Sequence, residues 1–215
     1  MNRMQTLETL EAWLGTHLPE VAADLQPGAG EEALQRLATA LGTALPDDFQ
    51  QLYRWHDGQA MAVNTGPWYG LTFLPLARVQ GECALWRQTL QEMGPETLAD
   101  LDSGMQSTPP GHVRKQYGNP LWIPFAYDWG GNYLGIDLDP DTLGTPGQVI
   151  SFGRDEERKI AVAPSLSAFV GWLVAELAGG NFHIQEEDDA GRSFNTLRPP
   201  KFHFLDSLAL LFPPA

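Results

Sequence analysis

Three aspartates within one short segment have the spacing that begins a calcium-binding loop. Asp137, Asp139 and Asp141 occupy alternate positions, as the first three ligands of such a loop do. The sixth position is Thr142, where the loop needs glycine, and the twelfth is Gln148, where it needs a bidentate glutamate. The segment therefore favours a turn whose aspartates accept hydrogen bonds from nearby backbone N–H groups.

A second set of candidate metal ligands lies near the C-terminus. His183 is followed by the acidic residues 186–189, and imidazole with carboxylates can bind a metal ion. A run of like charges is more often solvated surface. We therefore expect neither a metal site nor a cofactor in this chain.

Few residues of the chain occur in arrangements that are typical of catalysis. His56 and Asp57 could act as an acid–base pair, but a histidine at a helix end more often caps the last carbonyls. Cys83 lies on an apolar helical face and is expected in the core. The chain has no glycine-rich nucleotide motif, no Gly-x-Ser-x-Gly turn and no His-Glu-x-x-His motif. A hydrolase using carboxylates near Asp128 and Asp137 is the enzymatic alternative, but we predict no catalytic residue and no enzyme.

Aromatic residues in loops are the positive signal for function. Tyrosine and tryptophan are enriched at the centres of protein interfaces, and neighbouring acids would suit a basic partner. Two other surfaces are alternatives: the acidic tail, and the helix face of Glu31 and Glu32. The predicted partner-binding residues are Asp57, Trp68, Tyr69, Tyr127, Asp128, Trp129, Asp137 and Asp139.

Charge and composition narrow the class of protein. The 215 residues carry 27 acids and 13 bases, a formal net charge of −14 that repels polyphosphate and argues against direct nucleic-acid binding. A single cysteine, Cys83, excludes an intramolecular disulfide and indicates a reducing compartment. The most apolar run, residues 168–178, is too short to span a bilayer, and the N-terminus has no apolar signal segment. We expect a cytoplasmic protein without membrane contact.

The aromatic loop around residue 129 needs a sheet to position it. Two short runs of apolar and β-branched residues, 122–125 and 132–138, flank Gly130 and Gly131, which predicts an antiparallel hairpin. In the second run apolar residues alternate with others, the pattern of a half-buried strand. A strand is also predicted at 69–76, where Pro75 should truncate it or place it at a sheet edge. Strands at 148–152 and 159–162 continue the sheet as an antiparallel meander.

Helical spacing of apolar residues predicts five helices around this sheet, three of them before it. A serine at 165 offers an N-cap for the last one, and a Gly-Pro pair at 94–95 should end the fourth. Prolines and glycines predict an irregular loop over 100–120. The predicted helices cover residues 5–17, 31–41, 45–58, 78–93 and 165–177.

The C-terminal residues differ from the rest in composition. Residues 181–215 combine the acidic run, a Pro-Pro pair and a last apolar segment, after a domain of residues 1–180. We expect this extension to dock on its own domain or on a second copy, in which case it would make a homodimer.

Six short motifs occur in one order along the chain. They begin with Leu-Pro-Asp-Asp-Phe-Gln-Gln-Leu-Tyr at 45–53, and continue through Phe-Leu-Pro-Leu at 73–76 and Ile-Pro-Phe-Ala at 123–126. Ile-Asp-Leu-Asp at 136–139, the strand at 147–149 and the helix at 164–177 complete the series. Over residues 30–178 the chain thereby resembles the SMI1/KNR4 or SUKH superfamily.

That resemblance implies an α+β fold, a small twisted antiparallel sheet flanked by helices, here with a C-terminal extension. It implies no catalysis. Bacterial members are mostly immunity proteins that neutralise a toxin, often a nuclease or deaminase, and fungal members act in cell-wall regulation and morphogenesis. We therefore predict an immunity protein that occludes the active site of a basic cognate toxin, with a regulatory or scaffold protein of cell-wall synthesis as the alternative.

Overall fold

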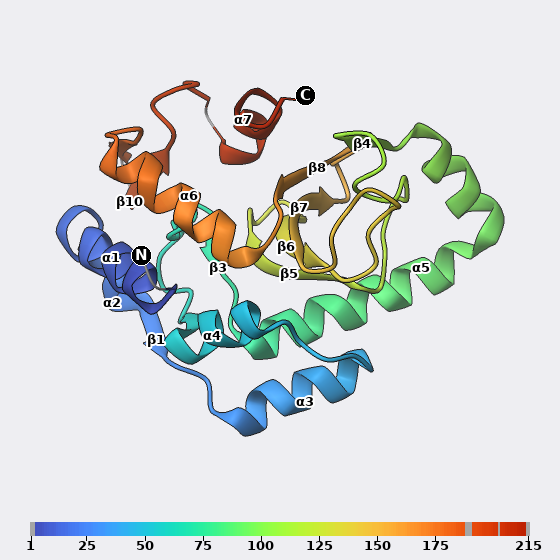
Figure 1. The fold of residues 1–215 in the computed structure, drawn as a ribbon, viewed down its shortest axis with the longest axis horizontal. Helices are drawn as coiled ribbons and strands as arrows, with labels where there is room; N and C mark the ends of the chain where they lie inside the picture. The colour runs from blue at the N-terminus through green and yellow to red at the C-terminus, as the bar shows by residue number, and fades with distance from the viewer. Residues whose placement is uncertain (1–2, 188–190, 202, 214–215) are drawn as a thin grey trace.

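A six-stranded twisted sheet forms the centre of the computed structural model, which describes residues 3–187, 191–201 and 203–213 (Figure 1). The strand order is β3-β5-β6-β7-β8-β4, and β5 to β8 form the antiparallel meander that the sequence predicts. Strand β4 was not predicted, and it pairs with β8 in parallel. The strands are β3 (Thr72–Phe73), β4 (Gln106–Thr108), β5 (Trp122–Tyr127), β6 (Asn132–Asp137), β7 (Gln148–Gly153) and β8 (Arg158–Ala163).

Strand β6 is buried on both faces, so the expectation of a half-buried strand is wrong. The alternation in its sequence reflects two different buried environments. Leu134 and Ile136 lie among apolar core residues, whereas Asp137 is satisfied by a hydrogen bond from Gln148. Gly135 lies against the Phe152 ring, because a Cβ there would meet Phe152 Cε1 at 2.6 Å.

Seven helices surround the sheet in the described part of the chain, and all five predicted helices are among them. Helix α5 packs along β5, and α6 packs on β7 and β8 and also contacts α1 and α4 (Figure 1). The helices are α1 (Arg3–His17), α2 (Pro19–Asp24), α3 (Glu31–Leu41), α4 (Asp47–Trp55), α5 (Leu76–Gly104), α6 (Leu166–Ala178) and α7 (Phe204–Leu211).

Several boundaries differ from the predictions for physical reasons. Helix α4 ends at Trp55, and the next residues form β2 (His56–Gln59), which pairs with β1 (Leu25–Pro27). Helix α5 continues beyond residue 93 through a kink at Gly94, whose φ is +73°, because the proline that follows can begin a new helical segment. The predicted 69–76 strand is confirmed as a short one at the sheet edge, because β3 ends before Pro75.

Helix α6 begins as predicted and is tied to α4. Ser165 Oγ accepts a hydrogen bond from the Ala168 N–H at 3.1 Å, which makes it the N-cap. Asp48 on α4 adds a second cap, because its Oδ2 accepts from the Ser167 N–H at 3.0 Å. One carboxylate thus stabilises the positive end of α6 and fixes the two helices together.

The C-terminal residues form the hairpin of β9 (His183–Glu187) and β10 (Gly191–Asn195), followed by α7. The rings of Phe194 and Phe204 each lie 5.0 Å from the Tyr69 ring. Tyr69 Oη also donates a hydrogen bond to the Asn181 carbonyl at 2.7 Å. These contacts join the C-terminal segment to the loop before the sheet; acidic residues 188 and 189 lie outside the described residues.

Cys83 lies in the core as expected, with 3% of its surface exposed. Burial raises the pKa of its thiol to about 12, so the thiol stays protonated at neutral pH. No helix of the described residues is both long enough and apolar enough to cross a membrane.

Candidate partner-binding groove

Two of the predicted binding residues, Trp68 and Tyr69, are buried in the core. They are 0% and 1% exposed. The Trp68 ring packs edge-on against Phe73 and Phe125, and Tyr69 is covered by the C-terminal segment. The expectation that this pair lies on the surface is therefore wrong.

Asp137 and Asp139 are part of a hydrogen-bonded turn. Asp137 is fully buried and accepts from Gln148 Nε2 at 3.0 Å and from the Asp139 N–H at 2.9 Å. Burial raises the pKa of the Asp137 carboxyl to about 6. Asp139 pairs with Arg114 at 3.0 Å and accepts from Asn119 Nδ2. Within the described residues, no three histidine, cysteine or acidic side chains are placed to hold a metal ion.

His56 and Asp57 point to different parts of the fold. His56 Nδ1 donates to the Gln26 carbonyl at 2.6 Å. Asp57 Oδ1 accepts from the Leu76 N–H at 2.8 Å, at the first residue of α5. Both groups hold backbone segments in place, and no hydrogen bond joins them.

The remaining three predicted residues, Tyr127, Asp128 and Trp129, lie together at the β5–β6 turn. Asp128 accepts hydrogen bonds from the Gly130 N–H, the Asn132 N–H and Asn132 Nδ2, at 2.6, 2.9 and 2.8 Å. This carboxylate organises the turn in the way that aspartate commonly does. It is therefore occupied by its own loop.

Trp129 is held in an unusual conformation at the surface. Its φ is +64°, in the left-handed region that a bulky side chain rarely adopts. Its Nε1 donates to Thr72 Oγ1 at 2.9 Å, yet 49% of the residue is exposed. The Asp128 turn and the Thr72 bond together fix a large apolar surface toward solvent.

Trp129 lines a groove of about 390 Å³ between the β5–β6 turn and α5, which we call the Trp129 groove. Two of its lining rings, Tyr127 and Tyr133, are stacked with centroids 5.2 Å apart, and Tyr133 stacks in turn on the buried Phe152 at 5.3 Å. Leu85, on the α5 side, is 57% exposed. The groove is lined by Arg78, Glu82, Leu85, Trp86, Thr89, Tyr117, Tyr127, Trp129, Gly130, Gly131, Tyr133 and Arg154.

A buried acid organises the polar groups of this groove. Tyr133 Oη donates to Glu82 Oε2 at 2.7 Å, and Glu82 Oε1 pairs with Arg78 Nε at 2.9 Å. Burial raises the pKa of Tyr133, and the bond to Glu82 raises it further. Burial also raises the pKa of Tyr127, so both hydroxyls stay protonated near neutral pH. The Tyr133 hydroxyl is used by Glu82, so the groove offers a ligand flat apolar surface and the hydroxyl of Tyr127.

Sequence reasoning missed the α5 side of this groove. Leu85 and Trp86 lie on the predicted helix 78–93 close to the buried Cys83, but Leu85 is exposed and Trp86 is half-buried beside Tyr117. No local signal marks Leu85 as exposed, because adjacent apolar residues of a helix can both be buried, as Leu52 and Tyr53 are on α4.

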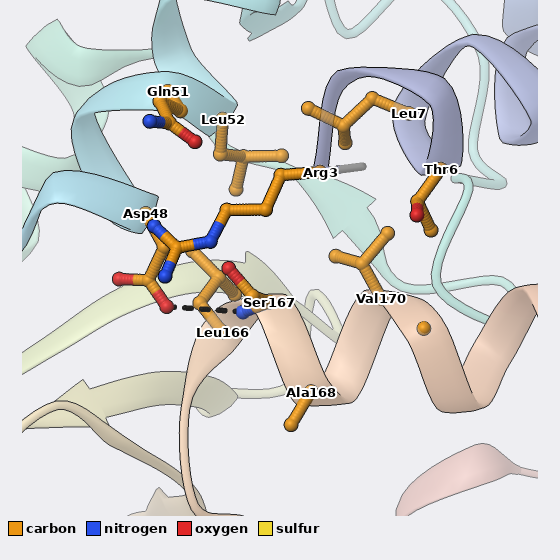
Figure 2. Close-up of a pocket in the computed structure, with 11 residues that line it drawn as sticks. Arg3, Thr6, Leu7, Asp48, Gln51, Leu52, Leu166, Ser167, Ala168 and Val170 are labelled. Atoms are coloured by element: carbon orange, nitrogen blue, oxygen red, sulfur yellow. Dashed lines mark hydrogen bonds between the residues drawn. The ribbon is translucent and has the colours of Figure 1, made fainter. Parts of the chain in front are cut away.

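A second cleft, of about 380 Å³, lies where α1, α4 and α6 meet. Figure 2 shows Arg3 extending from α1 toward α4, with Leu7, Leu52 and Val170 around it. Its acid, Asp48, is the group that caps α6. Because that carboxylate already joins α4 to α6, it is less available to a ligand, and we take the Trp129 groove as the candidate site.

The α+β fold, a twisted and mostly antiparallel sheet flanked by helices, defines the class of protein to which this chain belongs. The model of the SMI1/KNR4 family (SUKH-1) matches residues 28–172, and the chain belongs to this family. A "cell wall biosynthesis/cell cycle regulator smi1" of Schizosaccharomyces pombe is 33% identical over 205 residues, which cover 93% of this chain and 41% of that protein.

Two further fungal relatives have names of the same kind. A "glucan synthesis regulatory protein" of Neurospora crassa is 28% identical over 84% of this chain and 39% of its own length. A "cell wall assembly regulator SMI1" of Saccharomyces cerevisiae is 25% identical over 84% of this chain and 41% of its own length. The chain spans about two fifths of the length of these relatives.

These relatives overturn the prediction of a toxin-immunity protein. They are named as regulators of cell-wall or glucan synthesis, which agrees with the alternative function. The resemblance identified the family correctly, but its motifs are largely core residues such as Phe49, Leu52 and Ile136. Core residues fix a fold and do not specify which partner it binds.

Proposed function

We propose that this chain is a non-catalytic regulatory domain that acts in the control of cell-wall synthesis by holding a protein partner in the Trp129 groove. The names of its relatives support the process. The exposed side chains of Trp129 and Leu85 at an aromatic groove support the binding of a partner.

The observation that carries the proposal is the conformation of Trp129. A left-handed backbone costs a non-glycine residue about 1–3 kcal/mol, and such strain is concentrated at functional sites. A turn alone would be served better by glycine or asparagine at φ +64°. Tryptophan is the residue most typical of binding hot spots, and one fixed before binding loses little entropy when the partner arrives.

The test replaces the anchor and leaves the fold intact. Trp129→Ala is compared with Leu143→Ala, a matched control that is 67% exposed and lies beyond the opposite end of β6. Each variant is returned to the native host in place of the wild-type gene. Growth under wall-perturbing agents and recovery of partners with the tagged chain are then measured.

We expect Trp129→Ala to behave as a deletion strain under wall stress and to lose bound partners, whereas Leu143→Ala behaves as wild type. Circular dichroism of both purified variants checks that they are folded. A folded Trp129→Ala protein that restores growth and keeps its partners would refute the proposed site. A deletion strain without any wall phenotype would refute the process.

A further inference from the structure

The lining of the Trp129 groove has a charge opposite to that of the whole protein. The chain carries a formal net charge of −14, but the charged lining residues are two arginines, Arg78 and Arg154, and one acid, Glu82. Only 6% of the Glu82 side chain is exposed, and both its oxygens are engaged. The two arginine side chains are 51% and 67% exposed, so a ligand meets cations.

The two arginines line the same groove from different elements. Arg78 comes from the first turn of α5, and Arg154 follows β7. Burial raises the pKa of the Tyr127 hydroxyl, the charges of Glu82 and Asp128 raise it further, and the charges of both arginines oppose that rise. Arg154 lies along Gly131: a Cβ at that glycine would meet Arg154 Cδ at 2.8 Å. The glycine therefore lets this arginine lie against the turn that carries Trp129.

The ion pairs of these arginines leave most of their donors unused. Arg78 uses Nε on Glu82 Oε1 at 2.9 Å, and Arg154 uses Nε on Asp155 Oδ2 at 3.2 Å. Among the described residues, no hydrogen bond occupies the terminal Nη atoms of either arginine, whereas Glu82 and Asp128 already accept hydrogen bonds or ion pairs on both oxygens. The groove therefore offers guanidinium donors in the fork arrangement that a carboxylate accepts.

We propose that the Trp129 groove receives a segment of a protein partner in which an acidic side chain is flanked by apolar or aromatic residues. The apolar residues lie on the Tyr127–Tyr133 stack and against Leu85 and Trp129, and the carboxylate binds between Arg78 and Arg154. This inference rests on the proposed function and names its ligand chemistry. It also replaces, for this groove, the expectation that acids of this chain meet a basic partner.

The acidic residue should belong to the bound segment itself, and the partner as a whole should not be strongly acidic. A net charge of −14 repels a strongly acidic protein at long range, although salt limits that repulsion to about 8–10 Å. One or two acids within a neutral or basic partner avoid this repulsion and still reach the arginines. The groove therefore selects a short acidic–aromatic motif and disfavours an acidic protein as a whole.

Three short peptides test the charge preference directly. Acetyl-Leu-Phe-Glu-Phe-amide is compared with the same peptide carrying glutamine or lysine in place of glutamate. Binding to the full chain is followed by two-dimensional ¹⁵N–¹H NMR, at the Trp129 indole N–H and the Gly130 and Gly131 amides. We expect the glutamate peptide to bind about fivefold more tightly than the glutamine peptide at low salt, and the difference to shrink as salt rises.

Variants assign the preference to the arginines. In an Arg78→Gln, Arg154→Gln double variant the glutamate and glutamine peptides should bind equally, and Trp129→Ala should weaken both. Arg36→Gln is the matched control, because Arg36 is an exposed arginine, 62% accessible, in an ion pair on α3. It should keep the full preference for glutamate.

Equal affinity for the three peptides, tighter binding of the lysine peptide, or no shift of the groove signals with any of them would overturn this inference. Its failure is separable from that of the proposed function. If Trp129→Ala loses its function in the host while the peptides show no preference for glutamate, the regulatory role stands and the ligand chemistry is wrong. If Trp129→Ala keeps its function, the groove is not the regulatory site.

Discussion

The two aromatic pairs Trp68–Tyr69 and Tyr127–Trp129 each contain a residue with a left-handed backbone conformation. That residue is buried in the first pair and half exposed in the second. Each pair contains an aromatic residue at positive φ: +48° at Tyr69 and +64° at Trp129. Tyr69 is 1% exposed and Trp129 is 49% exposed. The C-terminal segment covers the first ring with Phe194 and Phe204, whereas Trp129 stays half exposed at the edge of its groove.

The difference lies in contacts that are distant in the sequence. Tyr69 donates to the carbonyl of Asn181, 112 residues later and beyond the 28–172 range that the family model matches. Trp129 bonds to Thr72 but remains at the surface. A strained aromatic residue is thus a core anchor where a later segment covers it, and a candidate binding anchor where none does.

The largest expected effect is at the covered residue. Tyr69→Ala should lower the free energy of unfolding by about 3–5 kcal/mol, because it removes a buried ring and its hydrogen bond. Urea denaturation followed by circular dichroism measures this. Tyr69→Phe keeps the ring and should cost only about 1–2 kcal/mol. A loss below about 1 kcal/mol for Tyr69→Ala would show that the C-terminal segment does not hold this ring.

The aspartates of the predicted patch also include a buried residue, Asp137, and more accessible ones. The buried carboxyl should change its protonation state near pH 6. Burial raises the pKa of Asp137 to about 6, above its ordinary value of 3.8. The native state therefore favours the protonated carboxyl. The stability that this group contributes is present below about pH 4 and is lost as the pH rises through 6.

Asp137→Asn removes this titration. Relative to wild type, the variant should gain unfolding free energy between pH 4 and pH 7, by an amount of the order of 3 kcal/mol at 1.36 kcal/mol per pKa unit. Urea midpoints and slopes of both proteins at the two pH values give the difference. Parallel pH dependence of the two proteins would show that the carboxyl ionises in the native state as easily as in the unfolded chain.

The half-buried acid, Asp128, should have a smaller effect on stability and a visible effect on the groove. Asp128→Ala leaves three N–H donors of the turn to water and should cost about 1–2 kcal/mol. Because the turn also fixes Trp129, its indole N–H signal should shift and broaden. Asp155→Ala, an exposed acid outside the groove, is the control, and equal effects of the two substitutions would contradict the role of Asp128.

Elements with strong local patterns were predictable from the sequence. The β5–β6 hairpin follows from two apolar runs around a glycine pair, and the start of α6 from Pro164–Ser165. The Asp128–Trp129 end of the candidate site was also found, because its residues are adjacent in the chain. Its other wall on α5 was not, because Arg78 and Leu85 come from a helix some 40 to 50 residues earlier.

The misassigned residues share one physical cause. Burial of Trp68, Tyr69 and Asp137 depends on pairing partners that no local pattern specifies: β5, the C-terminal segment and Gln148. Strand β4 was missed for the same reason, because only three residues pair, with β8 some 50 residues later. An aromatic or acidic residue in a loop therefore has no predictable exposure until long-range contacts are known.

The smallest expected effect on stability is that of replacing Trp129 by glycine. The same replacement at Tyr69 gives the clearest comparison of the two aromatic pairs. Trp129→Gly removes an exposed ring and its bond to Thr72, but it also removes the strain of a bulky residue at φ +64°. These opposing changes are each about 1 kcal/mol, so the unfolding free energy should stay within about 1 kcal/mol of wild type. Tyr69→Gly, the same change at the covered position, should cost at least about 3 kcal/mol. Peptide and partner binding should be lost in the Trp129 variant despite its near-normal stability. A large loss of stability for Trp129→Gly would mean that its ring, like that of Tyr69, belongs to the core.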